Sequence, residues 1–100
     1  YTGKGNTAQT IDCGFTSGAR FVLIKRSSGA SQWFVFDNER GITSTVNDGV
    51  LYLNLTNAEQ PESSAFGASI DAIQPDSSGF KVQYSDINSS GATFIFYAIA

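Results

Sequence analysis

The stretch Trp33-Phe34-Val35-Phe36-Asp37-Asn38-Glu39-Arg40-Gly41 contains the pattern that decides the fold. Four apolar residues that favour β-structure are followed by a turn-forming group that ends in glycine. Short apolar runs closed by Gly, Ser, Asn or Asp recur along the whole chain, and this spacing is typical of strands. We therefore expect seven strands, at Thr7–Cys13, Arg20–Arg26, Gln32–Asp37, Val50–Leu55, Ser69–Ile73, Gly79–Tyr84 and Thr93–Ile99.

No segment has the pattern of a good helix. The best candidate, Asn57 to Ser64, is interrupted by Pro61, which would remove a backbone donor and clash with the preceding turn. The sequence therefore predicts one all-β domain over residues 1–100: an antiparallel two-sheet β-sandwich, or a jelly-roll-like barrel, of about seven strands. Because the chain starts at Tyr1 and contains no Met, we expect it to be an excerpt or processed part of a longer polypeptide.

Several predicted strands are apolar without interruption. Phe21–Ile24, Trp33–Phe36 and Phe94–Tyr97 lack the alternation of a strand that has one face in water. Such runs imply that both faces are covered. Either these are central strands under loops, or the outer face of one sheet packs on a neighbouring subunit or domain, and we favour association because large exposed apolar patches are rare in monomers.

Composition excludes several classes of function. Charged residues make up 15% of the chain, the net charge is -3, and the six basic residues are scattered, so we expect no nucleic-acid partner. No apolar run is long enough to span a membrane, so no membrane partner is expected. There is no His and a single Cys, which excludes a Ser-His-Asp or Cys-His arrangement and leaves no credible metal site. We expect no enzyme activity and no cofactor.

The remaining polar motifs have structural explanations. Asp37 with Glu39, or Asp71 with Asp76, could form a carboxylate pair for glycoside hydrolysis, but acidic residues at strand ends are ordinarily turn formers. Asp86-Ile87-Asn88-Ser89-Ser90-Gly91 resembles half of a calcium loop and lacks its closing Glu. Asn88-Ser89-Ser90 also matches the N-glycosylation pattern, to which we give little weight.

Cys13 and the aromatic residues each allow two interpretations. Cys13 shares a predicted strand face with Ile11, which favours a buried thiol over a reactive one. The aromatic side chains could form an interface or a sugar-stacking platform, although a Trp on a central strand is more often core. The candidate interface or ligand aromatics are Trp33, Phe34, Tyr52, Tyr84 and Tyr97.

Blocks spread over most of the chain resemble an uncharacterised virion-associated β-sandwich module of tailed phages, especially marine ones. The stretch that begins at Trp33 is similar to the module's "W-x-V-F-D-x-x-R-G" core, and the other blocks follow in the module's order. These blocks are Tyr1–Asn6, Phe21–Arg26, Leu53–Glu59, Ser78–Val82 and Asn88–Ile95.

The resemblance implies a part without known catalytic activity in tail-fibre-like or capsid-decorating proteins. The matched residues have scaffold interpretations: Asp37 and Arg40 flank a tight turn at Gly41, while Thr56 and Glu59 resemble a capping box for one helical turn. We expect a virion-surface module, on the capsid exterior or a tail appendage, that assembles with virion proteins and homo-oligomerises. The alternatives are a module that binds a host-surface glycan or receptor at a fibre tip and, with least support, a hydrolase domain.

Overall fold

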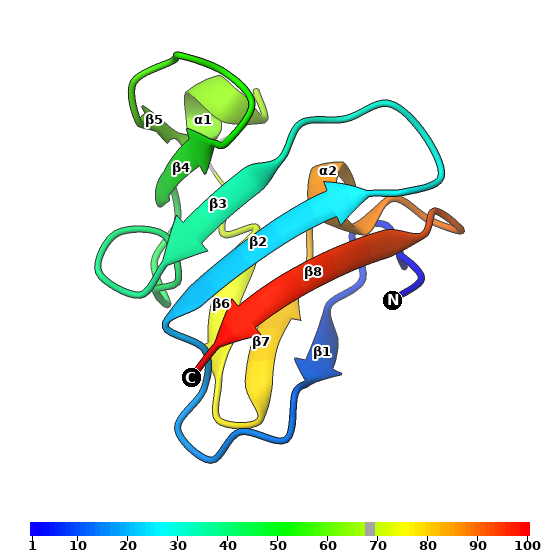
Figure 1. Ribbon diagram of the computed structural model, residues 1–100, viewed down its shortest axis with the longest axis vertical. Coiled ribbons are helices and arrows are strands. Elements are labelled where there is room, and N and C mark those ends of the chain that lie inside the picture. Colours follow the sequence, from blue (N-terminus) through cyan, green and yellow to red (C-terminus); the bar gives the residue numbers. More distant parts are fainter. Residues whose placement is uncertain (68–69) are drawn as a thin grey trace.

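Two antiparallel sheets stack face to face in the computed structural model, which describes residues 1–67 and 70–100 (Figure 1). The smaller sheet has the order β1-β7-β6 and the larger the order β5-β4-β3-β2-β8. The predicted two-sheet sandwich is confirmed, with β5 as a short additional strand. The strands are β1 Gln9–Asp12, β2 Phe21–Arg26, β3 Phe34–Asp37, β4 Gly49–Tyr52, β5 Gln60–Pro61, β6 Ile73–Asp76, β7 Gly79–Val82 and β8 Phe94–Ile99.

The core lies between the sheets and follows the two-residue period of the strands. In β2 the side chains of Val22 and Ile24 are fully buried, and they face inward because successive residues point to opposite sides. At the edge of the core, Phe96 of the larger sheet is 38% exposed, and its ring meets that of the buried Phe80 from the smaller sheet at a centroid distance of 5.3 Å. Edge-to-face aromatic contacts of this kind add to the burial of apolar area and hold the layers together.

The segment before β6 departs from the predicted strand Ser69–Ile73. Ser69 lies outside the described residues, residues 70–72 are irregular, and β6 runs from Ile73 to Asp76 through Pro75. The prediction ended too early because proline is a poor strand residue. It is tolerated here because β6 is an edge strand, where a missing N–H need not break the ladder.

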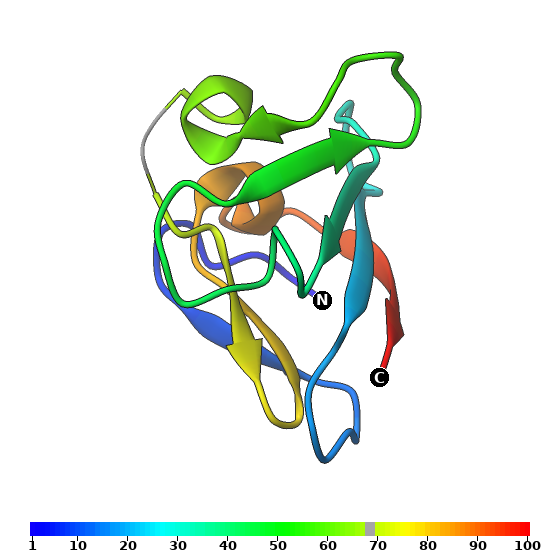
Figure 2. The ribbon, with the colours of Figure 1, turned by 90° about the vertical axis from the view of Figure 1, so that its left-hand side faces the viewer.

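Two one-turn helices were not predicted: α1 Glu62–Ala65 and α2 Ser85–Asn88. Residues 56–59 are irregular, so the predicted helical turn over Thr56 to Glu59 is absent. The turn begins instead after Pro61, whose φ of -68° is compatible with the start of a helix. Both helices stand at one end of the sandwich (Figure 2).

Asn88 joins the closing part of the chain to its beginning. Its side chain is fully buried. The Oδ1 atom accepts hydrogen bonds from Lys4 N and Gln9 Nε2, and Nδ2 donates to Gly5 O and Thr7 O. The Asn88 amide thus makes its four hydrogen bonds to other residues of the domain. In the folded domain it is therefore available neither for glycosylation nor as a calcium ligand.

Candidate assembly surface and polar pocket

Asp37 organises the turn after β3. Its Oδ1 accepts from the backbone N–H groups of Glu39 and Arg40. Its Oδ2 lies 2.7 Å from Arg40 Nε, and Arg40 Nη1 lies 3.1 Å from Glu59 Oε2. Gly41 is buried, and a Cβ there would lie 2.6 Å from Gly49 O, so a side chain would push β4 away. Glu59 therefore acts in an exposed ion pair across the turn and not in a capping box.

Three of the predicted interface or ligand aromatics pack against other aromatic rings of the domain. Phe34 is only 5% exposed, so it is a core residue and unavailable to a partner. The half-buried Tyr52 packs on Phe34 with ring centroids 5.6 Å apart, and the half-buried Tyr84 stacks on Phe66 at 6.0 Å. Phe34 faces inward because it alternates with Val35 on β3.

Trp33 and Tyr97 lie on the opposite side, the outer face of the larger sheet. The strand register places Tyr97, Leu23, Val35 and Leu51 in one row across β8, β2, β3 and β4. Trp33 lies just before β3, where Trp33 O accepts from Leu53 N. We call the apolar part of this surface the outer face. Its residues are Phe21, Leu23, Trp33, Val35, Leu51, Leu53, Ile95, Tyr97 and Ile99.

The outer face is open to solvent over β8. Over the other strands its side chains are half-buried against one another. Ile95 and Tyr97 are 51% and 62% exposed, whereas Leu23 is half-buried. Figure 1 looks onto this face, and no described segment crosses in front of β2 and β8. A shallow apolar hollow of about 100 Å³ lies between Leu23, Trp33 and Tyr97. Cover by loops, one of the two explanations for the apolar runs, is not seen in the part of the chain that the structure describes.

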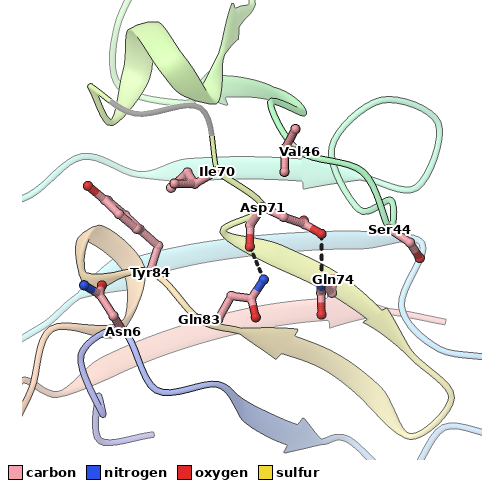
Figure 3. A pocket seen from close by; sticks show the side chains of 8 residues that line it. All are labelled: Asn6, Ser44, Val46, Ile70, Asp71, Gln74, Gln83 and Tyr84. Carbon is pink, nitrogen blue, oxygen red and sulfur yellow. Dashed lines mark hydrogen bonds between the residues drawn. The ribbon is translucent and has the colours of Figure 1, made fainter.

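A separate polar pocket of about 570 Å³ opens beside the smaller sheet (Figure 3). Asp71 lies at its centre, where Gln74 Nε2 donates to Asp71 Oδ2 at 2.7 Å and Gln83 Nε2 donates to Asp71 O. Tyr84 and Asn6 line one side of the pocket. The pocket thus combines an aromatic ring with carboxylate and amide groups.

Glu62, a buried carboxylate near this pocket, was missed by the sequence reasoning, which considered Asp71 only as a partner of Asp76. Glu62 is completely buried; its Oε1 and Oε2 accept from Ala72 N and Asp48 N. Burial raises the pKa of Glu62 to about 7. Burial also raises the pKa of Asp71, whose Oδ1 has no hydrogen-bond partner among the described residues. In the sequence Glu62 is only an acidic residue after a proline. Its hydrogen-bond partners are backbone groups from distant loops, and no local sequence pattern could reveal them.

Three further chemical possibilities concern a metal site, a carboxylate pair and the Cys13 thiol. Within residues 1–67 and 70–100, no group of three or more His, Cys, Asp or Glu side chains could hold a metal ion. Asp76 closes the β6–β7 turn by accepting from Ser78 N and Oγ, so it forms no carboxylate pair with Asp71. Cys13 is half-buried against the core, and burial raises its pKa, which disfavours the reactive thiolate. Neither helix in the described chain is long enough to cross a membrane.

Comparison with known families gives one match. The model of a domain of unknown function (DUF7483) matches residues 1–100. The chain belongs to this family. The DUF7483 match covers the strands of both sheets, the outer face and the polar pocket, and the family description assigns a role to none of them. The curated proteins and the solved structures contain no match to this DUF7483 domain.

Proposed function

We propose that this DUF7483 domain is a non-enzymatic assembly module that binds other protein subunits through the outer face of its larger sheet. One observation supports this most: Ile95, Tyr97 and neighbouring apolar side chains form a continuous surface that the domain itself leaves open. An antiparallel sheet with one face in water normally alternates apolar and polar residues. A contiguous apolar patch on a small domain is typical of an interaction site.

The setting that we propose for this assembly is the surface of a tailed-phage virion, on the capsid exterior or a tail appendage. It rests on the ordered resemblance around Trp33 to Gly41 and is independent of the geometry of the outer face. In this setting the partners are virion proteins and further copies of the same chain. The two charged residues on the outward side of β2 and β3, Lys25 and Asp37, lie toward opposite ends of the sheet. The middle of the face is uncharged, as at interface centres, where charged residues are depleted.

Sedimentation velocity over a wide concentration range tests the proposal. The wild-type domain should self-associate, and Ile95→Asp should weaken association by about tenfold or more. The substitution replaces an apolar side chain of the interface with a charge that must lose its water, even with Lys25 opposite it in the β2–β8 register. Thr10→Asp, on the outer side of the smaller sheet, is the matched control and should have no effect. If wild type and Ile95→Asp stay monomeric at every concentration, or associate equally, the outer face is not the self-assembly surface.

Carbohydrate binding in the polar pocket is a second candidate. The observation that favours it is the grouping of Tyr84, Asn6 and Asp71 around one open pocket, since small-molecule sites combine apolar surface with a few convergent polar groups. A glycan array checks this candidate directly. Binding by the wild type that disappears in Tyr84→Ala would support it, and absence of binding to all glycans on the array would count against it.

A further inference from the structure

The polar pocket has a negatively charged wall that the described residues do not neutralise. Asp71 lines the pocket, and two further carboxylates lie next to it, since Glu62 accepts from the backbone N–H groups of Asp48 and Ala72. Asp48, Glu62 and Asp71 are 6%, 0% and 8% exposed. Among the described residues, no Lys or Arg side chain forms an ion pair with any of the three. Buried charges without a counter-charge are costly, so this wall favours a cation.

One carboxylate oxygen of Asp71 is left without a hydrogen bond. Oδ2 accepts from Gln74 Nε2, whereas Oδ1 is buried and has no partner among the described residues. Most buried polar atoms in native proteins are hydrogen-bonded, so an atom like this one marks a place for a donor. Because Asp71 lines the pocket, a donor group on a ligand there would complete its hydrogen bonding.

The two glutamines beside Asp71 present further acceptors. Gln83 Nε2 donates to the backbone O of Asp71, and Gln74 Nε2 donates to its Oδ2. A backbone carbonyl and an ionised carboxylate can only accept, so each glutamine must direct its NH₂ group at Asp71. Figure 3 shows both Oε1 atoms pointing away from Asp71, and no described residue donates to them. The pocket therefore suits a ligand that is rich in hydrogen-bond donors.

Tyr84 gives the same pocket an aromatic side. Its ring stacks on Phe66 and lines the pocket together with Asn6. Asn6 Oδ1 accepts from Ser85 N, which leaves the NH₂ group of Asn6 as a donor for a ligand oxygen. An aromatic ring supplies apolar contact area and attracts a cation that lies over its face. A volume of about 570 Å³ is within the usual range for a small-molecule site.

We infer that the polar pocket binds an amino sugar, with its ammonium group at Asp71 and its hydroxyl groups at the two glutamines. This inference rests on the second candidate function, carbohydrate binding, and names the class of sugar. An ammonium group has three donors and a positive charge. It therefore meets both the unpartnered oxygen and the uncompensated charge of Asp71, in a charge-assisted hydrogen bond.

Other ligands of similar size fit the pocket less well. A neutral sugar satisfies the glutamines but leaves the charge of Asp71 uncompensated. An acidic sugar brings a negative charge close to the carboxylates, and like charges repel. A lysine side chain of a partner protein has the ammonium group but lacks hydroxyl donors for Gln74 and Gln83. Of these ligands, only an amino sugar matches both features of the pocket.

Titration of the wild-type domain tests the class of ligand without any substitution. The probes are the methyl glycosides of glucosamine, N-acetylglucosamine, glucose and glucuronic acid, together with lysine amide. They are compared at a pH above the pKa of Asp71 and below that of the amine, so that both groups are charged. Chemical-shift changes at the Asp71 and Gln83 amides in NMR spectra report binding. We expect the glucosamine glycoside to bind at least about tenfold more tightly than each other probe.

The outcomes distinguish this inference from the function on which it rests. If the glucose glycoside binds as tightly as the glucosamine glycoside, the amino-sugar class is overturned and carbohydrate binding stands. Tighter binding of the glucuronic acid glycoside or of lysine amide would also overturn it, in favour of an acidic sugar or a protein partner. If no probe binds, the inference fails, and the glycan array decides separately whether the pocket binds other carbohydrates.

Asp71→Asn tests the residue that carries the charge. The side chain keeps its shape, and its oxygen can still accept from Gln74. We expect the variant to lose at least about tenfold in affinity for the glucosamine glycoside and to bind the glucose glycoside as the wild type does. Asp12→Asn is the matched control, because it removes an equal charge at the exposed end of β1, outside the pocket. An unchanged preference for the amine in Asp71→Asn, or an equal loss in Asp12→Asn, would contradict the role of Asp71.

Discussion

The outward sides of the two sheets have opposite chemistry. In the smaller sheet the row that crosses β1, β7 and β6 is Thr10, Lys81 and Gln74, with Asp12 and Asp76 on the same side. In the larger sheet the equivalent row begins with Tyr97 and Leu23 and continues with apolar residues. The smaller sheet shows that this chain can build a polar wet face. The apolar outer face is therefore a local feature of the larger sheet and not a consequence of composition.

Adjacent residues of β3 give the largest effect that tests this difference. Phe36 is 1% exposed in the core, whereas Val35 faces outward. Phe36→Ala should reduce the free energy of unfolding by about 3–5 kcal/mol because it leaves a cavity. The isosteric Val35→Thr should change the stability of the monomer by about 0.5 kcal/mol or less. Urea unfolding at low concentration measures both values.

A large destabilisation of the monomer by Val35→Thr would contradict the difference between the buried and the outward side of β3. It would mean that the outer face already contributes to the fold of the single chain, as a core does. The apolar residues would then need no partner to explain them.

A change of pH should alter the stability of the domain much more than its self-association. The pKa of Glu62 is about 7 in the folded domain, against an ordinary value of 4.5. Between these values the folded state holds a proton that the unfolded state has lost. The free energy of unfolding should therefore fall as pH rises through this window, by up to about 3 kcal/mol. Because Asp71 also has a raised pKa, its contribution has the same sign.

Urea unfolding across this pH window measures the fall, and Glu62→Gln should flatten it because the amide does not titrate. Self-association should change much less than stability, since Leu23 and Ile95 on the outer face have no ionisable group. Stability that rises with pH in the wild type would contradict the protonated state of buried Glu62. Equal slopes for wild type and Glu62→Gln would place the titrating group elsewhere.

Strands were predictable where local sequence decides them. The apolar runs of β2, β3 and β8 are rich in β-branched and aromatic residues, and their lack of alternation is enough to indicate a sheet with two apolar faces. The helices α1 and α2 have one turn each, too short to show a helical period. β6 was misplaced because its tolerance for Pro75 depends on its position at a sheet edge.

Sites were less predictable because they depend on residues distant in sequence. Asn88 resembled a glycosylation or calcium-loop residue, yet its four hydrogen bonds reach residues about eighty positions away. Glu62 is buried by loops that no local pattern connects to it. Phe34 and Tyr97 are both aromatic strand residues, and only the register of the sheet decides that one is core and the other is surface.

Solvent accessibility of methyl groups at low and high protein concentration tests most directly whether the outer face is an interface. A soluble paramagnetic probe relaxes exposed methyl groups in the NMR spectrum. We predict that the methyl groups of Leu23, Val35 and Ile95 lose relaxation by the probe as concentration rises, while the methyl group of Thr10 on the smaller sheet does not change. If all these methyl groups remain equally accessible at every concentration, the outer face is not used for self-assembly.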